Sequence, residues 1–421
     1  MTNEPAHELV LNRPLPAQRQ FLSSPAKIRL YIGGLGAGKT ISGTFAIAGM
    51  PPGSRGLIVA PTYPMLRDIV CKELESVYGP LVRIKRADMV AEWPASGITA
   101  LLRSAEKPDR LRGPNIDWAW GDEAAMYSAA AVTQIISRVR QGESRSWFTT
   151  TPRKGCALYD ILVASADPDV AQFRSRTADN RHLPPDYEPR LRRIYSAALA
   201  AQELDAEWID VTGGLWQDVE IPRIERYRQE DVIRWVIGVD PAATARDDSD
   251  ETGIILAALH RNRDDGSEFV VVHHDWSGRY SPGRWAEIVC DYARRYKATV
   301  VIEVNQGGDM VAHTLRTAWA EVPIQEVRAT TGKALRADPV VAMYEQGRVR
   351  HLGEFPKLET QMRGWDPSGS RSSPDRLDAL VWAVYGLGIT AQEPSAHVRV
   401  HGTPLHRQTP QTAVRTGRDW R

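Results

Sequence analysis

The sequence predicts an α/β fold in two domains, and three observations lead to that prediction. The chain has 421 residues, which is more than one hydrophobic core usually supports. Short apolar runs that are typical of buried strands alternate with segments of helical spacing. In both halves of the chain some of these runs end in polar or acidic residues, as strands do at the ligand-binding edge of an open sheet.

The composition narrows the class of protein. Charged residues make up 25% and hydrophobic residues 42% of the chain, which is the balance of a soluble globular protein. No apolar run is long enough to span a bilayer, and the first eight residues do not form a signal peptide. We therefore expect a cytoplasmic protein that does not contact membranes. Since the net charge is only +1, any contact with DNA must come from a local patch.

Three cysteines are too few and too far apart for a disulfide framework or a zinc site. They are Cys71, Cys156 and Cys290.

The first strand is predicted at 28–32, and a helix follows over 41–50. A glycine-rich loop joins them and contains Gly33, Gly36, Gly38, Lys39 and Thr40. Glycines at the first and sixth positions let the backbone N–H groups surround an anion, and the helix adds its positive end. Lys39 is then expected to reach the β- and γ-phosphates of a nucleotide, and the Thr40 hydroxyl to hold Mg²⁺. A tight turn with a surface lysine is the alternative, but the strand–loop–helix context favours a phosphate-binding loop.

Further strands are predicted at 56–60 and 98–102, with a helix over 64–78 between them. The next apolar strand, 116–122, ends in the adjacent acids Asp122 and Glu123. At the carboxyl edge of a parallel sheet, Asp122 would complete the Mg²⁺ shell and Glu123 would polarise the attacking water. Two surface acids that cap a strand are the alternative.

The strand at 146–151 ends in three threonines, Thr149 to Thr151. Hydroxyls beside the γ-phosphate, that of Thr150 among them, can bind it and report hydrolysis to the rest of the domain. Threonines are also simply good strand formers.

Two further polar features accompany the phosphate loop. Gln18 stands upstream of it, where a glutamine reads the adenine edge in many ATP-driven nucleic-acid motors, although a solvated glutamine fits as well. An arginine that neutralises charge in the transition state could come from the same subunit or from a neighbour. The candidates are Arg110, Arg112, Arg138, Arg140 and Arg145.

We place the first domain at 1–215, with a helical segment over 189–208, and a linker without clear periodicity at 216–231. The second domain is placed at 232–390. Its predicted elements are strands at 235–240, 253–259, 268–273 and 299–305 and helices at 282–296 and 374–382.

Acids stand at corresponding places in this second domain. Asp240 and Glu303 end strands, whereas Asp375 and Asp378 share one face of the last helix. Three strands, a helix, a fourth strand and a later helix with acids form an RNase H-like layout. Its chemistry requires acids that converge on two divalent cations about 4 Å apart, and hard oxygen ligands suit Mg²⁺ or Mn²⁺.

Residues 391–421 are rich in Pro, Thr, Gln, His and Arg, and they contain only two acids. We expect this basic tail to be disordered, because such a composition does not bury a core. It would then contact DNA or a partner electrostatically, or serve only solubility.

These motifs together resemble those of the large terminase subunit, the DNA-packaging motor of tailed bacteriophages and gene-transfer particles. The resemblance covers about residues 12–390 and depends on the order and spacing of the motifs. They are Pro16-Ala17-Gln18, the phosphate loop, Ala60-Pro61-Thr62-Tyr63-Pro64, Leu111-Arg112-Gly113, Gly121-Asp122-Glu123-Ala124, Thr149-Thr150-Thr151-Pro152, Gly238-Val239-Asp240, Glu303-Val304-Asn305-Gln306-Gly307-Gly308 and Ser373-Pro374-Asp375-Arg376-Leu377-Asp378-Ala379.

The resemblance implies a P-loop ATPase domain of the ASCE type followed by an RNase H-like nuclease domain. Gln18, Lys39, Thr40, Asp122 and Glu123 match the ATP-site residues of the family, and Thr149 to Thr151 match its coupling motif. Asp240, Glu303 and Asp375 match its metal-binding acids, and Asp378 is a further candidate partner.

In one respect the chain departs from the pattern. Some members carry an arginine early in the phosphate loop, where this chain has Gly34 and Leu35. We therefore look for the charge-neutralising arginine first at Arg138 and Arg140 of a neighbouring subunit.

The resemblance further implies ATP-driven pumping of double-stranded DNA into a procapsid through the portal ring, and cleavage of concatemeric DNA. The implied partners are DNA, the portal protein, a small terminase subunit and further copies of the chain in a ring, in the host cytoplasm and transiently at the portal. Two other classes remain open. One is an RNase H-like strand-transfer enzyme with an ATPase domain, and the other is an assembly protein that binds ATP without hydrolysing it.

Overall fold

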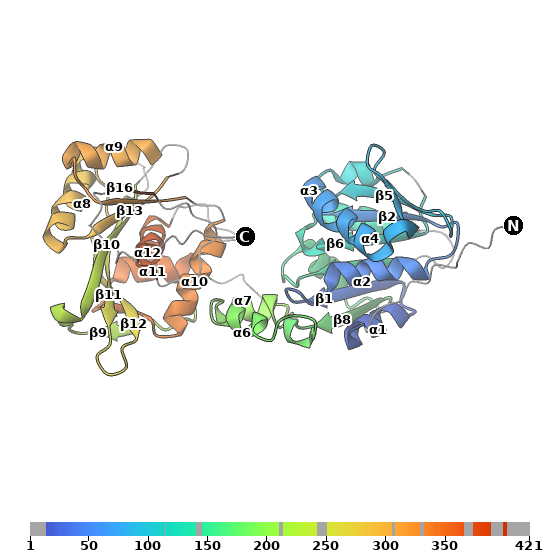
Figure 1. Cartoon of the computed structure of the whole chain (residues 1–421), viewed down its shortest axis with the longest axis horizontal. Helices are drawn as coiled ribbons and strands as arrows, with labels where there is room; N and C mark the ends of the chain where they lie inside the picture. Colours follow the sequence, from blue (N-terminus) through green and yellow to red (C-terminus); the bar gives the residue numbers. More distant parts are fainter. Residues whose placement is uncertain are drawn as a thin grey trace, which may run out of the picture. The chain divides into compact units, whose positions relative to one another are not determined.

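The computed structural model describes residues 14–113, 115–139, 145–209, 214–241, 251–304, 308–328, 332–365, 374–388 and 399–401. It divides into two compact units, which Figure 1 shows as a blue-to-green half and a yellow-to-red half. The first unit is Met1–Glu220 with Val341–Gln346 and Arg363–Ser370, and the second is the remainder. The division after Glu220 falls inside the segment 216–231 that was predicted as the linker.

The first unit is built on an eight-stranded sheet in the order β3-β4-β5-β2-β6-β7-β1-β8. Its strands are β1 (Ile28–Gly33), β2 (Arg55–Ala60), β3 (Arg83–Lys85), β4 (Val90–Trp93), β5 (Ile98–Ser104), β6 (Trp118–Asp122), β7 (Arg145–Thr150) and β8 (Val170–Ser175). From β5 to β8 all neighbours are parallel, whereas β3 and β4 form an antiparallel ribbon at the edge. The carboxyl ends of six strands therefore meet at one edge of the sheet.

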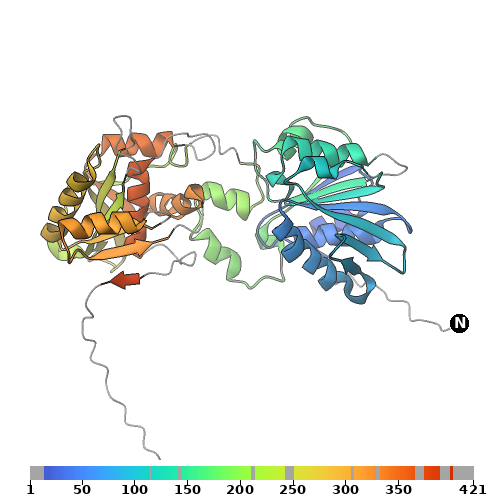
Figure 2. The same cartoon turned by 90° about the horizontal axis from the view of Figure 1, so that it is seen from above.

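Helices cover both faces of this sheet, as Figure 2 shows with blue helices on one side and teal helices on the other. The α-helices of this part of the chain are α1 (Pro16–Ser23), α2 (Lys39–Ala46), α3 (Tyr63–Met65), α4 (Cys71–Tyr78), α5 (Ala129–Arg138), α6 (Tyr187–Arg192) and α7 (Ala197–Glu203), and the last two lie away from the faces of the sheet. Because side chains alternate along a strand, Tyr31 joins the core on one face, and Leu30 and Ile32 join the core on the other.

Several helix boundaries differ from the prediction. The helix predicted over 41–50 begins at Lys39 and ends at Ala46, before a 3-10 turn. The helix predicted over 64–78 contains a π-helical turn at Leu66–Val70. The helix predicted over 189–208 is two helices, because Ser196 caps a new one by accepting a hydrogen bond from the Leu199 N–H. The sequence did not indicate β8, whose half-exposed edge position leaves it without a continuous apolar run.

The second unit contains another eight-stranded sheet, in the order β16-β14-β13-β10-β11-β12-β15-β9. Its strands are β9 (Arg223–Ile224), β10 (Val232–Asp240), β11 (Gly253–Arg261), β12 (Glu268–Asp275), β13 (Thr299–Glu303), β14 (Ile324–Val327), β15 (Val349–Leu352) and β16 (Arg399–His401). The first three long strands, β10 to β12, are antiparallel, and β13 and β14 then run parallel to β10. The predicted linker is not free of structure, since β9 lies within it and pairs with β15.

Figure 1 shows α8 and α9 on one side of this sheet and α12 on the other. The helices are α8 (Pro282–Tyr296), α9 (Gly308–Ala318), α10 (Lys333–Glu345), α11 (Pro356–Gly364) and α12 (Asp375–Gly386). Ile237 and Val239 of β10 face the core under α8, so the alternate residues Gly238 and Asp240 face α12.

Part of the tail that was expected to be disordered forms β16, which pairs antiparallel with the edge strand β14. An edge strand offers unpaired backbone groups, and β14 uses them to bind this segment. The rest of the predicted tail, 391–398 and 402–421, lies outside the described residues. None of the described helices combines the length and the apolar character that a membrane crossing requires.

Three buried histidines make the second unit sensitive to acid. Burial lowers the pKa of His260 to about 4, of His273 to about 3 and of His351 to about 4, from an ordinary value of 6.5. The Nε2 atoms of His260 and His273 lie 3.0 Å apart, so one neutral ring donates to the other. Below about pH 6.5 the unfolded chain binds protons that the folded chain refuses, so stability falls as the pH is lowered toward 4.

We expect the free energy of unfolding of the second unit to fall by up to about 1.4 kcal/mol per pH unit for each of these groups between pH 6.5 and 4. Hydrogen exchange at the amides of β11 and β12, corrected for the intrinsic effect of pH, measures it. Equal protection at pH 7 and pH 5 would contradict the prediction.

Candidate active sites

The phosphate loop lies between β1 and α2 at the carboxyl edge of the first sheet. Gly38 caps α2 in the left-handed conformation, with φ of 75°, and Gly36 has φ of 72°. A residue with a Cβ would be strained at both places. A Cβ on Gly33, the last residue of β1, would lie 2.7 Å from Lys39 Cγ, so this glycine leaves room for the lysine stem.

The outer side of the loop is bound by the segment that follows β8. The Gly34 N–H donates to the Ser175 carbonyl (3.0 Å), and the Leu35 N–H donates to the Glu203 carbonyl (2.6 Å). The Thr177 hydroxyl donates to the Leu35 carbonyl (2.8 Å) and the Asn180 amide to that of Gly36 (2.7 Å). These contacts fix the loop before any ligand binds. The sequence did not reveal them, because the strand that positions this segment was not predicted.

Asp122 at the end of β6 lies beside the loop. Its carboxylate accepts hydrogen bonds from the Thr40 hydroxyl (3.1 Å) and the Thr149 hydroxyl (2.6 Å). Burial and the neighbouring charge of Glu123 raise the pKa of Asp122 to about 7, although Thr149, Thr40 and Lys39 favour its charged form. A hydroxyl and a carboxylate side by side are the oxygen ligands that Mg²⁺ prefers, and a cation there would offset the cost of burying the acid.

Glu123 turns the chain sharply, with φ of 48°. A left-handed conformation in a residue other than glycine costs roughly 1 kcal/mol or more, and such residues gather at functional sites. The turn brings the Glu123 carboxylate 3.5 Å from Lys39 Nζ, and its other oxygen accepts from the Thr151 N–H at 3.3 Å. Lys39 also donates to the Gly34 carbonyl (3.2 Å). The lysine and the glutamate thus face each other across the mouth of the loop.

The Thr150 hydroxyl is engaged in two hydrogen bonds within the protein. Its oxygen accepts from the Ala125 N–H (2.9 Å), and its proton goes to the Thr151 carbonyl (3.0 Å). The hydroxyl therefore joins the end of β7 to the turn that begins with Glu123. A displacement of Glu123 would therefore be transmitted through Thr150 to β7.

Gln18 is buried, so the alternative of a solvated glutamine is wrong. Its side-chain oxygen accepts from the Leu15 N–H, and its amide donates to the Gly38 carbonyl (3.3 Å) and the Ser42 hydroxyl (3.0 Å). Gln18 thus attaches α1 to the loop, next to the start of α2.

The candidate arginines lie at different edges of the first sheet. Arg145 begins β7 and Arg138 ends α5, so both lie at the edge opposite the phosphate loop of their own subunit. Arg110 and Arg112 follow β5 and lie toward the loop edge. Arg140 is outside the described residues.

In the second unit, four carboxylates from three elements converge. Asp240 ends β10, Glu303 ends the neighbouring strand β13, and Asp375 and Asp378 lie in the first turn of α12. Burial and the charges of Asp378, Asp375 and Glu303 raise the pKa of Asp240 well above its ordinary value, and Lys333 opposes them. The acids that the sequence singled out are therefore close enough to interact strongly.

This convergence requires α12 to touch the sheet. A Cβ on Gly238 would lie 2.1 Å from the Ala379 carbonyl oxygen, and one on Gly253 would lie 2.0 Å from that of Asp375. Both contacts are impossible for a larger residue, so the two glycines determine how near the helix brings its acids to Asp240.

Two side chains then hold α12 in place. The Arg376 guanidinium is buried and binds Glu251 (2.8 Å) and Asp275 (2.5 Å) at the ends of β11 and β12. Gln361 of α11 accepts from the Leu377 N–H (3.0 Å), which no residue of α12 itself satisfies. Arg376 stands inside the motif that the sequence indicated, but Gln361 carries no sequence signal.

Two cations of α10 face the acids. Lys333 Nζ lies 2.6 Å from Asp378 Oδ2, and Arg336 lies 3.7 Å from Glu303. The sequence did not single out either residue.

Among the described residues, no three His, Cys, Asp or Glu side chains are gathered as ligands of an ion. The donor set nevertheless fits divalent cations, because it consists of carboxylates whose repulsion a nearby positive charge relieves.

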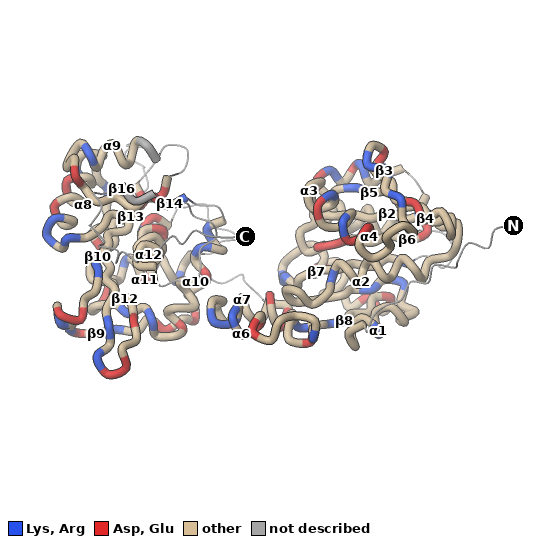
Figure 3. Tube along the Cα trace, in the orientation of Figure 1, with Lys and Arg blue, Asp and Glu red and all other residues tan. Residues whose placement is uncertain are grey.

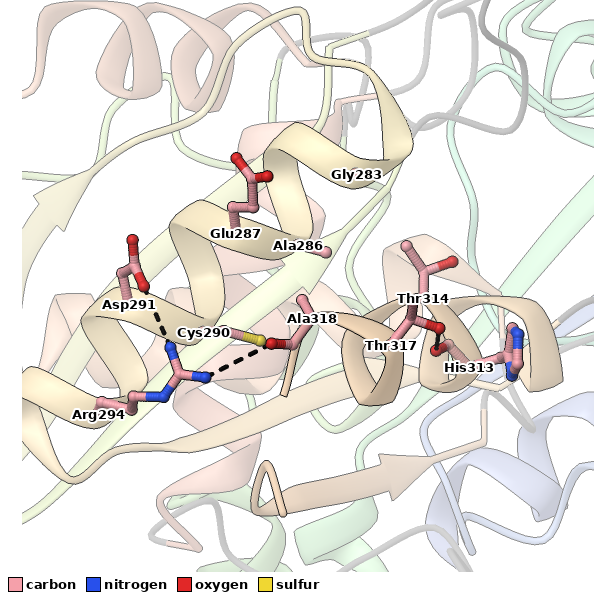
Figure 4. Close-up of a pocket in the computed structure, with 10 residues that line it drawn as sticks. All are labelled: Gly283, Ala286, Glu287, Cys290, Asp291, Arg294, His313, Thr314, Thr317 and Ala318. Carbon is pink, nitrogen blue, oxygen red and sulfur yellow. Dashed lines mark hydrogen bonds and ion pairs between the residues drawn. The ribbon is translucent and has the colours of Figure 1, made fainter. Parts of the chain in front are cut away.

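A separate hollow of about 450 Å³ lies between α8 and α9. Figure 4 shows Arg294 bound to Asp291 and to the Ala318 carbonyl, with Cys290 on the same helix. The α8 and α9 side of the sheet is opposite the face that carries Asp240, so none of the predicted site residues lines this hollow. Among the residues that the structure describes, Figure 3 shows basic and acidic segments interleaved in each unit.

We expect Gly238→Ala to destabilise the protein by about 1–3 kcal/mol, because its Cβ collides with the α12 backbone. Urea unfolding measures the change. Gly283→Ala in α8 is the control, since its Cβ meets nothing within 4 Å and alanine favours a helix. Equal stability of the two variants would show that α12 does not pack as described.

Comparisons with known proteins agree with this architecture. Residues 30–223 match the family model for the N-terminal part of the large terminase subunit, T4likevirus type. Residues 237–386 match that of the terminase RNase H-like domain. Curated protein sequences contain no match.

Solved structures of large terminases share the fold. The large terminase of a thermophilic bacteriophage, in complex with ADP, is 16% identical with a TM-score of 0.56, over 90% of this chain and 100% of that one. The same phage protein with ATP-γ-S is 14% identical with a TM-score of 0.53, over 88% and 98%.

The predicted fold class, a P-loop ATPase domain followed by an RNase H-like nuclease domain, is thereby confirmed. The two family models together cover most of the chain, and the chain belongs to the large terminase subunit family.

Proposed function

We propose that the chain hydrolyses ATP to translocate double-stranded DNA into a procapsid through the portal, and that it cuts concatemeric DNA with a metal-dependent nuclease site. The observation that carries the proposal is the pairing of two acid-bearing sheets in one chain. In the first, Asp122 lies 3.1 Å from Thr40 of the phosphate loop. In the second, three further acids surround Asp240.

In the ATPase reaction, Lys39 binds the β- and γ-phosphates of ATP, and Thr40 and Asp122 hold Mg²⁺. Bound Mg²⁺ neutralises charge on the phosphates. When Lys39 turns from Glu123 to the phosphates, the Glu123 carboxylate is left beside the γ-phosphate, where it orients water and accepts its proton. Thr150 passes a displacement of this turn to β7.

Gln18 is proposed to read the adenine edge, with the second lone pair of its side-chain oxygen as the group that the loop contacts leave. Arg138 or Arg140 is proposed to act on the ATP site of a neighbouring subunit. Arg138 supports a role in trans, because it lies at the edge of the sheet away from its own phosphate loop.

In the cleavage reaction, Asp240, Glu303 and Asp375 hold the divalent cations, and Asp378 is a further ligand. Two Mg²⁺ or Mn²⁺ ions held by these acids would supply activation of water and stabilisation of the leaving oxygen of the phosphodiester. The buried Arg376 keeps the acids of α12 in position.

The function implies partners beyond DNA. We propose that copies of the chain form a ring on the portal, in the host cytoplasm, and that a small terminase subunit selects the DNA.

We expect Lys39→Ala to lower ATP hydrolysis by roughly two orders of magnitude or more while Mn²⁺-dependent plasmid cleavage remains. Asp240→Ala should have the converse effect, because the two sites use separate residues. A chelator should stop cleavage by the wild type. Cleavage that persists in Asp240→Ala would overturn the metal-site assignment, and loss of both activities in a folded Lys39→Ala would show that the sites are not independent.

The variant Glu123→Gln tests the hydrolytic role of that residue. Glutamine retains the hydrogen bond from the Thr151 N–H but accepts no proton, so ATP hydrolysis should fall by about 100-fold or more while nucleotide binding remains. Binding is measured with a fluorescent ATP analogue. Unchanged turnover would favour an assembly protein that binds ATP without using it, and joining of DNA ends by the wild type would favour a strand-transfer enzyme.

A further inference from the structure

The two cations that face the nuclease acids differ in how firmly they are held. Arg336 is 7% exposed, and its guanidinium lies 4.9 Å from the ring of Trp382. The Lys333 side chain is 44% exposed, whereas that of Asp378, its partner at 2.6 Å, is only 10% exposed. Arg336 is thus packed into the unit, and Lys333 reaches a buried carboxylate from the surface.

The position of Lys333 in its own helix does not explain why this residue is a lysine. It is the first residue of α10, where the positive end of a helix disfavours a cation, and the first turn contains no acid to compensate. The contact with Asp378 does explain the lysine. An ionised carboxylate at that depth, with Asp240 and other acids around it, requires a counter-charge.

We propose that Lys333 is a resident counter-ion of the nuclease site, which holds Asp378 in the metal-free protein and competes with the divalent cations for that carboxylate. The inference rests on the proposed nuclease function. A lysine suits this role because its compact charge sits on a flexible stem, and the Lys333 side chain is 44% exposed. Arg336 does not suit it, since departure would break its contact with Trp382.

The test is a calorimetric titration of the full chain with Mn²⁺. Lys333→Gln removes the competitor at nearly constant size, so Mn²⁺ should bind more tightly, by on the order of fivefold. In EDTA, the variant should have a lower melting temperature than the wild type. Saturation with Mn²⁺ should abolish this difference in melting temperature. Lys357→Gln is the matched control, because this exposed lysine of α11 gives the same change in net charge.

If the glutamine variant does not fold without metal, the titration is made with Lys333→Arg, which keeps the charge. Its fork can grip Asp378 with two hydrogen bonds, so Mn²⁺ should bind more weakly than to the wild type.

Mn²⁺ affinity that is unchanged or weaker in Lys333→Gln would overturn the inference while the nuclease assignment stands. An equal gain in Lys357→Gln would also overturn it, because the effect would then be one of net charge. If the folded, ATP-hydrolysing wild type binds no Mn²⁺, the proposed nuclease function fails as well.

Discussion

The mutual repulsion of four carboxylates is the constraint on which the second unit depends. The carboxyl ends of β10 and β13 and the first turn of α12 bring these acids together, and burial and the charges of the other three acids raise the pKa of Asp240. Such an arrangement persists only where the backbone leaves the acids no room to separate. Gly238 and Gly253 admit α12 to the sheet, and Arg376 ties the helix to β11 and β12. Part of the folding free energy of the unit is thus used to hold like charges close together. Divalent cations would bind to acids in this arrangement.

In the first unit the unbalanced charge is positive. Its loop is shaped for an anion, with glycines at left-handed positions and Lys39 at the mouth. Glu123 then faces that lysine, just as Lys333 faces Asp378 in the second unit. In both units a residue of the protein supplies the charge that a ligand would bring. The internal partner keeps each site in shape without a ligand, and under the proposed function the nucleotide and the divalent cations would have to displace it.

Much of the fold could be predicted from the sequence, because its central strands are continuous apolar runs that end in acids, as β6 and β10 do. The acids themselves were identifiable for the same reason. Elements with weaker patterns were not. β3, β8, β9 and β15 are short or half-exposed, and α10 carries Pro339 inside it. Lys333 and Gln361 act on residues about 45 and 16 positions away in the chain, and a single sequence contains no signal of such distances.

The π-helical turn at Leu66–Val70 has a consequence for the length of the chain. A π-turn holds one residue more than the α-helix around it requires, so the phase of everything after it depends on that residue. Beyond it, Leu74 lies in the core and the Tyr78 hydroxyl donates to the Thr44 carbonyl of α2 at 2.8 Å. Loss of a single residue here would rotate α4 by about 100° and turn both side chains away. This helix therefore tolerates substitution on its exposed face far better than any change in its residue count.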